Sequence, residues 1–338
     1  MKIRRKNTSP IYSFQSSNIW SNKRFKKLIY RNYNKIFLIF QKLGIHIVPN
    51  HFYFPIPDTR MLTDEVINHQ TELIGVDINE KEQLELLSIF ESNYKKELDS
   101  FPRYKTKIPY QYYSTNGNFR SVDGDILYCM IRHFKPKNII EIGSGNSTYC
   151  SAQAIRKNKE IDKNYECELT AIEPYPNEIL KKGFPGLSKL IPTKLQEVPL
   201  ETFMKLKEND ILFIDSSHVL HIGNDVQYEF LEILPRVNKG VIIHIHDIFL
   251  PKEYPLLWIT NLHRFYNEQY LLQAFLTLNN SFKVIWAGKY MHLKQEEKLK
   301  KVFKSFEKDI TEFNSKSLTK VDEWPIEWPS SFWIKRIS

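Results

Sequence analysis

The feature that most constrains this chain is an alternation of short apolar segments with helical segments, which begins near residue 100. Apolar segments typical of buried strands lie at 138–142, 168–173, 188–196, 211–216, 240–247, 282–288 and 330–337. Helical patterns between them lie at 147–158, 199–207, 225–234, 264–279 and 293–316. This alternation indicates an α/β fold with a doubly wound parallel sheet and helices on both faces. In such sheets, ligands bind beyond the carboxyl ends of the strands.

The N-terminal part of the chain has a different character. Its helical patterns lie at 23–43, 63–73 and 79–98, and residues 1–57 contain eleven Lys or Arg and no Asp or Glu. Subtracting these eleven charges from the net charge of +9 leaves −2 for the rest of the chain. We therefore predict a basic, mainly helical extension or lid at 1–100 and a catalytic domain at 101–338.

The uneven charge also bears on partners. A nucleic-acid enzyme would carry positive charge around its cleft, so we expect no nucleic-acid partner. Two interpretations of the basic end stay open: a solvated lead segment, or peripheral contact of residues 1–42 with an anionic membrane or polymer. The apolar stretch at 35–48 is shorter than the ~20 residues that a membrane span needs. With no secretory signal and no CxxC pair, we expect a cytoplasmic protein.

A glycine turn follows the first strand, in "NIIEIGSGNSTYC" (138–150). Gly143 and Gly145 flank Ser144 and allow the backbone to approach a ligand closely. A dinucleotide fingerprint would have a third glycine where Thr148 stands, and Glu141 would repel a pyrophosphate. The turn therefore favours a cationic, nucleoside-type cofactor over NAD.

Acidic side chains follow three further strands. Glu173 comes after the second and is placed to accept hydrogen bonds from ribose hydroxyls. Asp215 follows the strand at 211–216, and His246 and Asp247 follow the strand at 240–247. These three side chains should converge, where they could bind a divalent ion or deprotonate a hydroxyl. His218, on the loop after Asp215, is a further candidate base.

The residues together resemble a class I S-adenosylmethionine-dependent methyltransferase. "EIGSG" is similar to that family's cofactor loop, and Glu173 stands where its ribose-binding acid does. Segments such as "PNHFYFPIPDTR", "DGDILYCMIRHFKP", "DILFIDSSHV" and "EILPRVNKGVIIHIHDIFLP" resemble a bacterial branch often associated with surface-glycan and secondary-metabolite pathways. The similarity spans roughly residues 40–290 and returns in "FWIKR".

The resemblance implies strand order 3-2-1-4-5-7-6 with the last strand antiparallel. It implies S-adenosylmethionine as cofactor, with Glu141 near its ammonium group. The cofactor-binding residues would be Glu141, Gly143, Ser144, Gly145, Glu173 and Asp215.

The implied reaction is methyl transfer, which we expect to modify a hydroxyl of a small molecule or glycan. Deprotonation would use Mg²⁺ or another divalent metal at Asp215 and Asp247, or His218 as base with His246 and Asp215 as further catalytic candidates. Two alternatives remain: a non-catalytic cofactor-binding member of the fold, and an NAD-linked sugar oxidoreductase. The acceptor, O- against N-methylation and the oligomeric state are not predicted from sequence.

Overall fold

We analysed the chain in a computed structural model, which describes residues 23–306, 308 and 329–338. The contacts divide the chain into two compact units, Met1–Met61 and Leu62–Ser338. This division precedes the boundary that we expected near residue 100, because α3 (Glu80–Leu98) packs with the second unit through buried Leu86, Leu87 and Phe90. Residues 1–22, part of the basic lead segment, lie outside the described residues.

The first unit contains α1 (Lys23–Lys42) and a 3-10 turn, η1 (Thr59–Met61). Helix α1 coincides with the helix expected at 23–43. After it the chain turns back, and the His46 ring stacks on the Phe37 ring at a centroid distance of 5.4 Å. None of the helices in the described ranges is long and apolar enough to cross a membrane.

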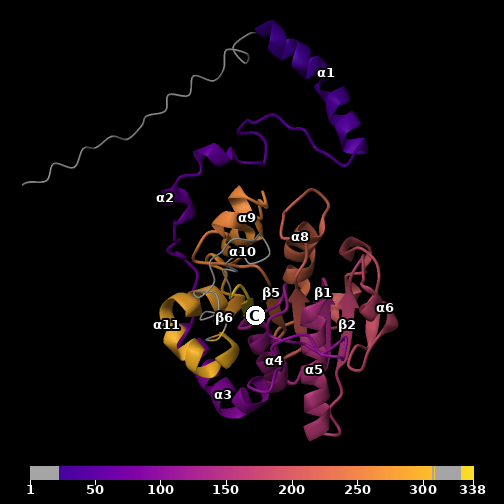
Figure 1. Ribbon diagram of the computed structural model, residues 1–338, viewed down its shortest axis with the longest axis vertical. Coiled ribbons are helices and arrows are strands. Elements are labelled where there is room, and N and C mark those ends of the chain that lie inside the picture. The colour runs from indigo at the N-terminus through magenta and orange to yellow at the C-terminus, as the bar shows by residue number, and fades with distance from the viewer. Residues whose placement is uncertain (1–22, 307, 309–328) are drawn as a thin grey trace, which may run out of the picture. The chain divides into compact units, whose positions relative to one another are not determined.

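The second unit is built on a seven-stranded sheet (Figure 1). Its strands are β1 (Asn138–Ile142), β2 (Glu168–Ile172), β3 (Lys189–Ile191), β4 (Ile211–Ile214), β5 (Ile242–Ile245), β6 (Phe282–Ala287) and β7 (Phe332–Arg336). The order is β3-β2-β1-β4-β5-β7-β6, and only β7 among these runs antiparallel to its neighbours. This confirms the predicted sheet order.

The parallel register determines which residues meet at the ligand edge. Ile142 pairs with both Ile172 and Ile214, and Ile214 pairs with Ile245. The residues that directly follow these four partners are therefore neighbours at one edge of the sheet: Gly143, Glu173, Asp215 and His246.

Helices cover both faces of the sheet in Figure 1. The remaining helices are α2 (Asp64–Ile67), α4 (Asp123–Phe134), α5 (Asn146–Ile161), α6 (Glu178–Lys182), α7 (Glu201–Met204), α8 (Asp225–Tyr228), α9 (Leu256–Thr260), α10 (Glu268–Leu276) and α11 (Gly288–Val302). One core contains residues of α3, α4, α5 and α11, and the other contains residues of α7 and α10. Ile139 lies in the first core and Ile140 in the second, as strand alternation requires.

Several elements differ from the sequence-based expectation. Helix α11 begins at Gly288, because β6 passes directly into it, and residues 309–316 of the helix expected at 293–316 lie outside the described residues. The helix expected at 225–234 is α8 followed by a π-helical turn, η3 (Glu229–Ile233), and a 3-10 turn, η4 (Leu234–Arg236). π-helical turns often occur at functional sites. This one places the Glu229 side chain in the interior.

Candidate active site

A cavity of about 630 Å³ opens at the carboxyl ends of β1, β2 and β4. Its lining includes Gly143, Glu173, Asp215, Ser217 and His221. It occupies the place where a doubly wound sheet binds its ligand, beside the strand-to-helix turn that precedes α5.

Only glycine fits at position 143. Its φ of 78° lies in the left-handed region, and its N–H donates to the carbonyl of Ile172 at 3.0 Å. A Cβ at this position would lie 1.9 Å from the carbonyl oxygen of Asp215. The turn after β1 and the end of β4 are therefore in backbone contact, and no side chain fits between them.

Glu141 is a completely buried carboxyl group at the end of β1. Its Oε1 accepts hydrogen bonds from the Ser147 hydroxyl at 2.6 Å and the Thr148 hydroxyl at 3.1 Å. Its Oε2 is buried with no hydrogen-bond partner, as is the Ser144 hydroxyl oxygen in the adjacent turn. Burial raises the pKa of Glu141 to about 8. An unpartnered oxygen on a buried carboxyl fits a cationic ligand group, which would compensate the cost of ionising it.

Glu173 connects the two turns at this edge of the sheet. Its carboxylate accepts from the backbone N–H of Ser144 at 3.3 Å and from that of Tyr175 at 2.8 Å. The side chain is half-buried and lines the cavity. A carboxylate has about four lone-pair sites, so two remain for the hydroxyls of a ribose. The glycine turn, Glu141 and Glu173 thus fit the cofactor that the sequence analysis expected.

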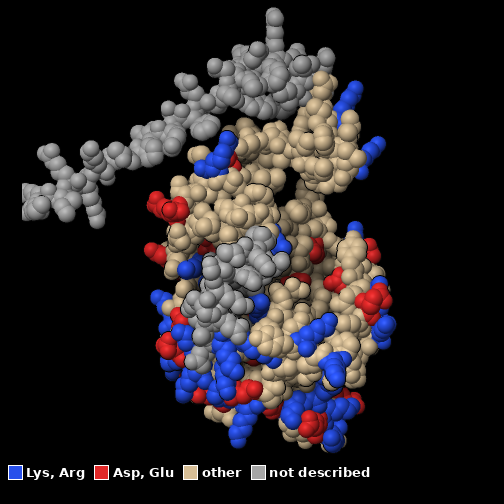
Figure 2. All heavy atoms as spheres, in the orientation of Figure 1, with Lys and Arg blue, Asp and Glu red and all other residues tan. Residues whose placement is uncertain are grey.

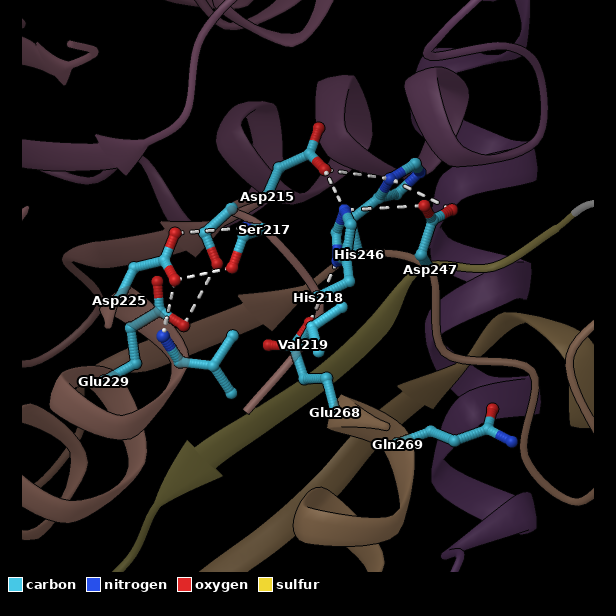
Figure 3. Close-up of polar contacts among 12 residues, drawn as sticks. Asp215, Ser217, His218, Val219, Asp225, Glu229, His246, Asp247, Glu268 and Gln269 are labelled. Carbon is cyan, nitrogen blue, oxygen red and sulfur yellow. Dashed lines mark hydrogen bonds and ion pairs between the residues drawn. The ribbon is translucent and has the colours of Figure 1, made fainter. Parts of the chain in front are cut away.

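The ends of β4 and β5 bring two imidazoles and two carboxylates together (Figure 3). The Oδ1 of Asp215 lies 3.3 Å from His218 Nε2 and 3.3 Å from His246 Nδ1. Asp247 completes the group, 3.5 Å from each of the same two nitrogens. The convergence of Asp215, His246 and Asp247 is confirmed, and His218 joins them.

A third carboxyl group, Glu268, holds the other side of His218. Its Oε2 lies 2.9 Å from His218 Nδ1, and its side chain is 1% exposed at the start of α10. The backbone supports the same contact, because the N–H of Asn267 donates to the His218 carbonyl at 3.1 Å. In the sequence, Glu268 belongs to the polar run at 267–270, which could frame an acceptor pocket or begin a plain surface helix.

The carboxyl groups around His218 and His246 determine whether the two imidazoles are protonated. Burial lowers the pKa of His218, but Asp215, Asp247 and Glu268 outweigh it and raise that pKa well above 6.5. Burial likewise opposes protonation of His246, and Asp215 and Asp247 raise its pKa well above 6.5. For Asp215, burial favours the neutral acid, but the two imidazoles hold its pKa below the usual range. The ligand-free site therefore holds imidazolium–carboxylate pairs at neutral pH.

His246 is also attached to a helix that the sequence analysis did not assign. Its Nε2 lies 3.6 Å from Asp123 at the start of α4, whose carboxylate accepts from the backbone N–H of Ser330 at 3.0 Å and of Ser331 at 2.9 Å. Helix α4 is almost completely buried and so lacks the polar face that identifies a surface helix. Asp123 thereby connects His246 to the segment that enters β7.

His244 plays a different part from its neighbour. Its ring is completely buried and stacks on the Phe213 ring at a centroid distance of 4.0 Å. Its Nε2 lies 2.9 Å from the Ser331 hydroxyl oxygen. Burial lowers its pKa well below 6.5. His244 is therefore a neutral core residue.

The divalent ion expected at Asp215 and Asp247 stays a prediction. Within residues 23–306, 308 and 329–338, no group of three or more His, Cys, Asp or Glu side chains is arranged to hold a metal ion. In the ligand-free site, the raised pKa values of His218 and His246 place protonated nitrogens against these carboxylates. The carboxylates thus balance imidazolium charge, and we derive no step through a metal.

Comparison with known proteins gave a family match and several relatives. Residues 140–248, from β1 to just past β5, match the family model described as "Methyltransferase domain". A protein of Archaeoglobus fulgidus, itself named only "Uncharacterized protein", is 34% identical over 179 residues, which are 51% of this chain and 78% of that protein.

Solved structures of methyltransferases are also similar to this chain. They include the O-methyltransferase TomG from Streptomyces achromogenes in complex with S-adenosylmethionine (14% identity, 61% of this chain, 85% of that chain, TM-score 0.33). The plantazolicin methyltransferase BamL, in complex with a substrate analogue and S-adenosylhomocysteine, matches at 14% identity over 77% of this chain and 97% of that chain, with a TM-score of 0.37. Likenesses at these TM-scores add nothing to what the sheet order and the family match already show.

Proposed function

The chain belongs to the class I S-adenosylmethionine-dependent methyltransferases, and from this membership we propose that it methylates a hydroxyl oxygen of a small molecule or glycan, with His218 as general base. The observation that carries the proposal is the His218 imidazole. Glu268 Oε2 lies 2.9 Å from one of its nitrogens, and the other lies 3.3 Å from Asp215, which lines the cavity. A hydroxyl acceptor needs such a base, because it must lose its proton as the new bond forms.

Cofactor binding would use the residues at the ends of β1 and β2. We assign the Glu141 carboxylate to the ammonium of the cofactor and Glu173 to its ribose hydroxyls, with Gly143, Ser144 and Gly145 along the turn. Asp215 would face the same ligand from the end of β4. When bound, S-adenosylmethionine supplies a methyl group on a sulfonium, which is already activated for in-line displacement.

The protein's remaining task is to position the acceptor, exclude water and take the proton. As the methyl carbon passes from sulfur to the acceptor oxygen, the hydroxyl proton would pass to His218 Nε2. His218 must first be neutral, and its raised pKa opposes this in the ligand-free site. A cationic ligand in the cavity would lower that pKa, since like charge disfavours imidazolium.

The experiment that tests the proposed function is a product analysis. Extracts incubated with the protein and methyl-labelled S-adenosylmethionine should yield a labelled small molecule or glycan. Mass spectrometry and NMR then identify the atom bonded to the new methyl carbon. A methyl carbon bonded to nitrogen or sulfur would overturn O-methylation while leaving the family assignment intact.

Metal independence gives a second check. We expect the rate of methyl transfer to be unchanged by EDTA and by added Mg²⁺ or Mn²⁺, because the carboxylates that would bind a metal face imidazolium. The measurement is the initial rate under each condition, with a known metal-dependent methyltransferase assayed in parallel. A rate lost in EDTA and restored by Mg²⁺ would assign deprotonation to a metal instead of His218.

The ribose assignment predicts a change in cofactor affinity. Glu173→Ala should weaken binding of S-adenosylhomocysteine by about 1.5–3 kcal/mol, because a charge-assisted hydrogen bond to the ribose is lost. Isothermal titration calorimetry measures the change, and Glu178→Ala on α6, an exposed acid, serves as the matched control. An unchanged affinity in folded Glu173→Ala would remove the ribose role.

A further inference from the structure

The first unit presents an apolar stripe along α1 and the turn after it. Ile36, Ile39 and Leu43 are spaced three and four residues apart, which places them on one face of a helix. Their exposed fractions are 41%, 59% and 69%, so no described side chain of the first unit covers this anchor stripe. Burying such a stripe would be favourable, and a surface of this kind usually marks an interaction site.

Exposed apolar residues continue after the helix. Large side chains that are also exposed include Ile45, Ile47, Phe52, Tyr53 and Ile56. Phe52 and Tyr53 are each 82% exposed, and their ring centroids lie 4.4 Å apart. Large aromatic side chains beside an apolar stripe are typical of segments that lie at a membrane–water interface.

Positive charge accompanies the anchor stripe. Lys35 and Lys42 are exposed and lie four and three residues from Ile39, so they flank the anchor stripe on α1. Basic side chains of this segment are visible at the surface of α1 in Figure 2. In sequence, residues 1–57 contain eleven basic and no acidic residues, whereas the rest of the chain sums to −2. The net positive charge thus belongs to the segment that carries the exposed apolar side chains.

We propose that α1 and residues 43–56 dock on an anionic lipid bilayer, with the anchor stripe immersed among the acyl chains and the lysines at the phosphate groups. The two features together select this partner. An anionic polymer would pair with the charge but would leave the apolar stripe exposed, whereas a bilayer surface satisfies both. Helix α1 lies in the plane of the interface, since none of the described helices can span a membrane.

The test measures co-flotation of the full chain with vesicles. We expect binding to vesicles of phosphatidylcholine with phosphatidylglycerol, weak binding to phosphatidylcholine alone, and loss of binding as salt rises to ~0.5 M. Ile39→Asn should weaken partitioning roughly tenfold, because an immersed apolar side chain is lost. Leu38→Asn is the matched control, because Leu38 is 46% exposed but does not lie three or four residues from any member of the anchor stripe, and partitioning should stay unchanged. Far-UV circular dichroism checks that both variants fold.

Four outcomes would overturn the proposal. If the wild-type chain does not bind anionic vesicles, a lipid bilayer is not its partner. Equal partitioning of Ile39→Asn and wild type would show that the anchor stripe is not immersed. Absence of vesicle binding together with a dimer that Ile39→Asn dissociates, measured by analytical ultracentrifugation, would assign the stripe to a second copy of the chain. Binding to dextran sulfate but not to vesicles would assign the charge to an anionic polymer.

Discussion

His218→Asn should lower the maximal rate of methyl transfer by about 10²–10⁴-fold, the usual contribution of a general base. The affinity for S-adenosylhomocysteine should change little, because the cofactor contacts are assigned to Glu141 and Glu173. In the wild type, the rate should rise with pH through an apparent pKa well above 6.5, since only neutral imidazole accepts a proton and three carboxyl groups raise its pKa. The pH profile of kcat/KM, which reports the ligand-free enzyme, measures this rise, and the variant's profile should be flat over the same range.

Two variants of Glu268 separate positioning from structure. Glu268→Gln keeps an oxygen that can accept from His218 Nδ1 but removes a negative charge, so the apparent pKa of kcat should move down and the base should work at lower pH. Glu268→Ala removes the acceptor as well and should lower kcat with little change in KM. A purely structural Glu268 would leave the pH profile of both variants in place. A wild-type rate in His218→Asn would assign deprotonation to another group.

Glu141→Gln should weaken binding of S-adenosylhomocysteine by about 3 kcal/mol at pH 8, because the buried partner of the ligand's ammonium loses its charge. The pH dependence of this affinity is a more specific test of the Glu141 assignment. Glu141 has a pKa of about 8 in the ligand-free site, and only its ionised form pairs with a cation. Wild-type affinity should therefore rise about tenfold per unit between about pH 6 and pH 8, with one proton released on binding. Calorimetry in buffers of different ionisation enthalpy measures that proton.

The ligand-free protein offers an independent readout of the same group. The pKa of Glu141 is raised on folding from 4.5 to about 8, so the folded chain keeps a proton that the unfolded chain releases in this window. The free energy of unfolding should accordingly fall as pH rises from 4.5 towards 8, and Glu141→Gln should remove that fall. Glu168→Gln, at the exposed amino end of β2, is the matched control. Proton release that persists in Glu141→Gln would contradict the assignment.

Local patterns in the sequence were enough for the sheet and its ligand edge. Strand residues such as Ile139 and Ile140 pack into two cores on opposite faces, and the continuous apolar run that this requires is visible without a structure. Once the strands were placed, the parallel arrangement required Glu173 and Asp215 to end at one edge, whatever the details of the helices. The cofactor side of the site was therefore predictable.

The environment of the imidazoles was not predictable in the same way. Glu268 reaches His218 from a helix fifty residues further along the chain, and Asp123 reaches His246 from a helix with no polar face. Neither contact leaves a periodic signal, because each depends on how a helix packs and not on its own pattern. The protonation of the two imidazoles was not predictable for the same reason: the charges that set their pKa values come partly from residues distant in sequence.

The contact between Gly143 and Asp215 limits how this site can evolve. The space beside Gly143 is filled by the carbonyl oxygen of residue 215 and not by its side chain. Every amino acid carries that oxygen, so no second substitution at position 215 makes room for a side chain at position 143. Genetic suppressors of a Gly143 variant would have to move a whole strand. Gly143 is thus fixed independently of the methyl acceptor, while the residues that contact the acceptor remain free to diverge.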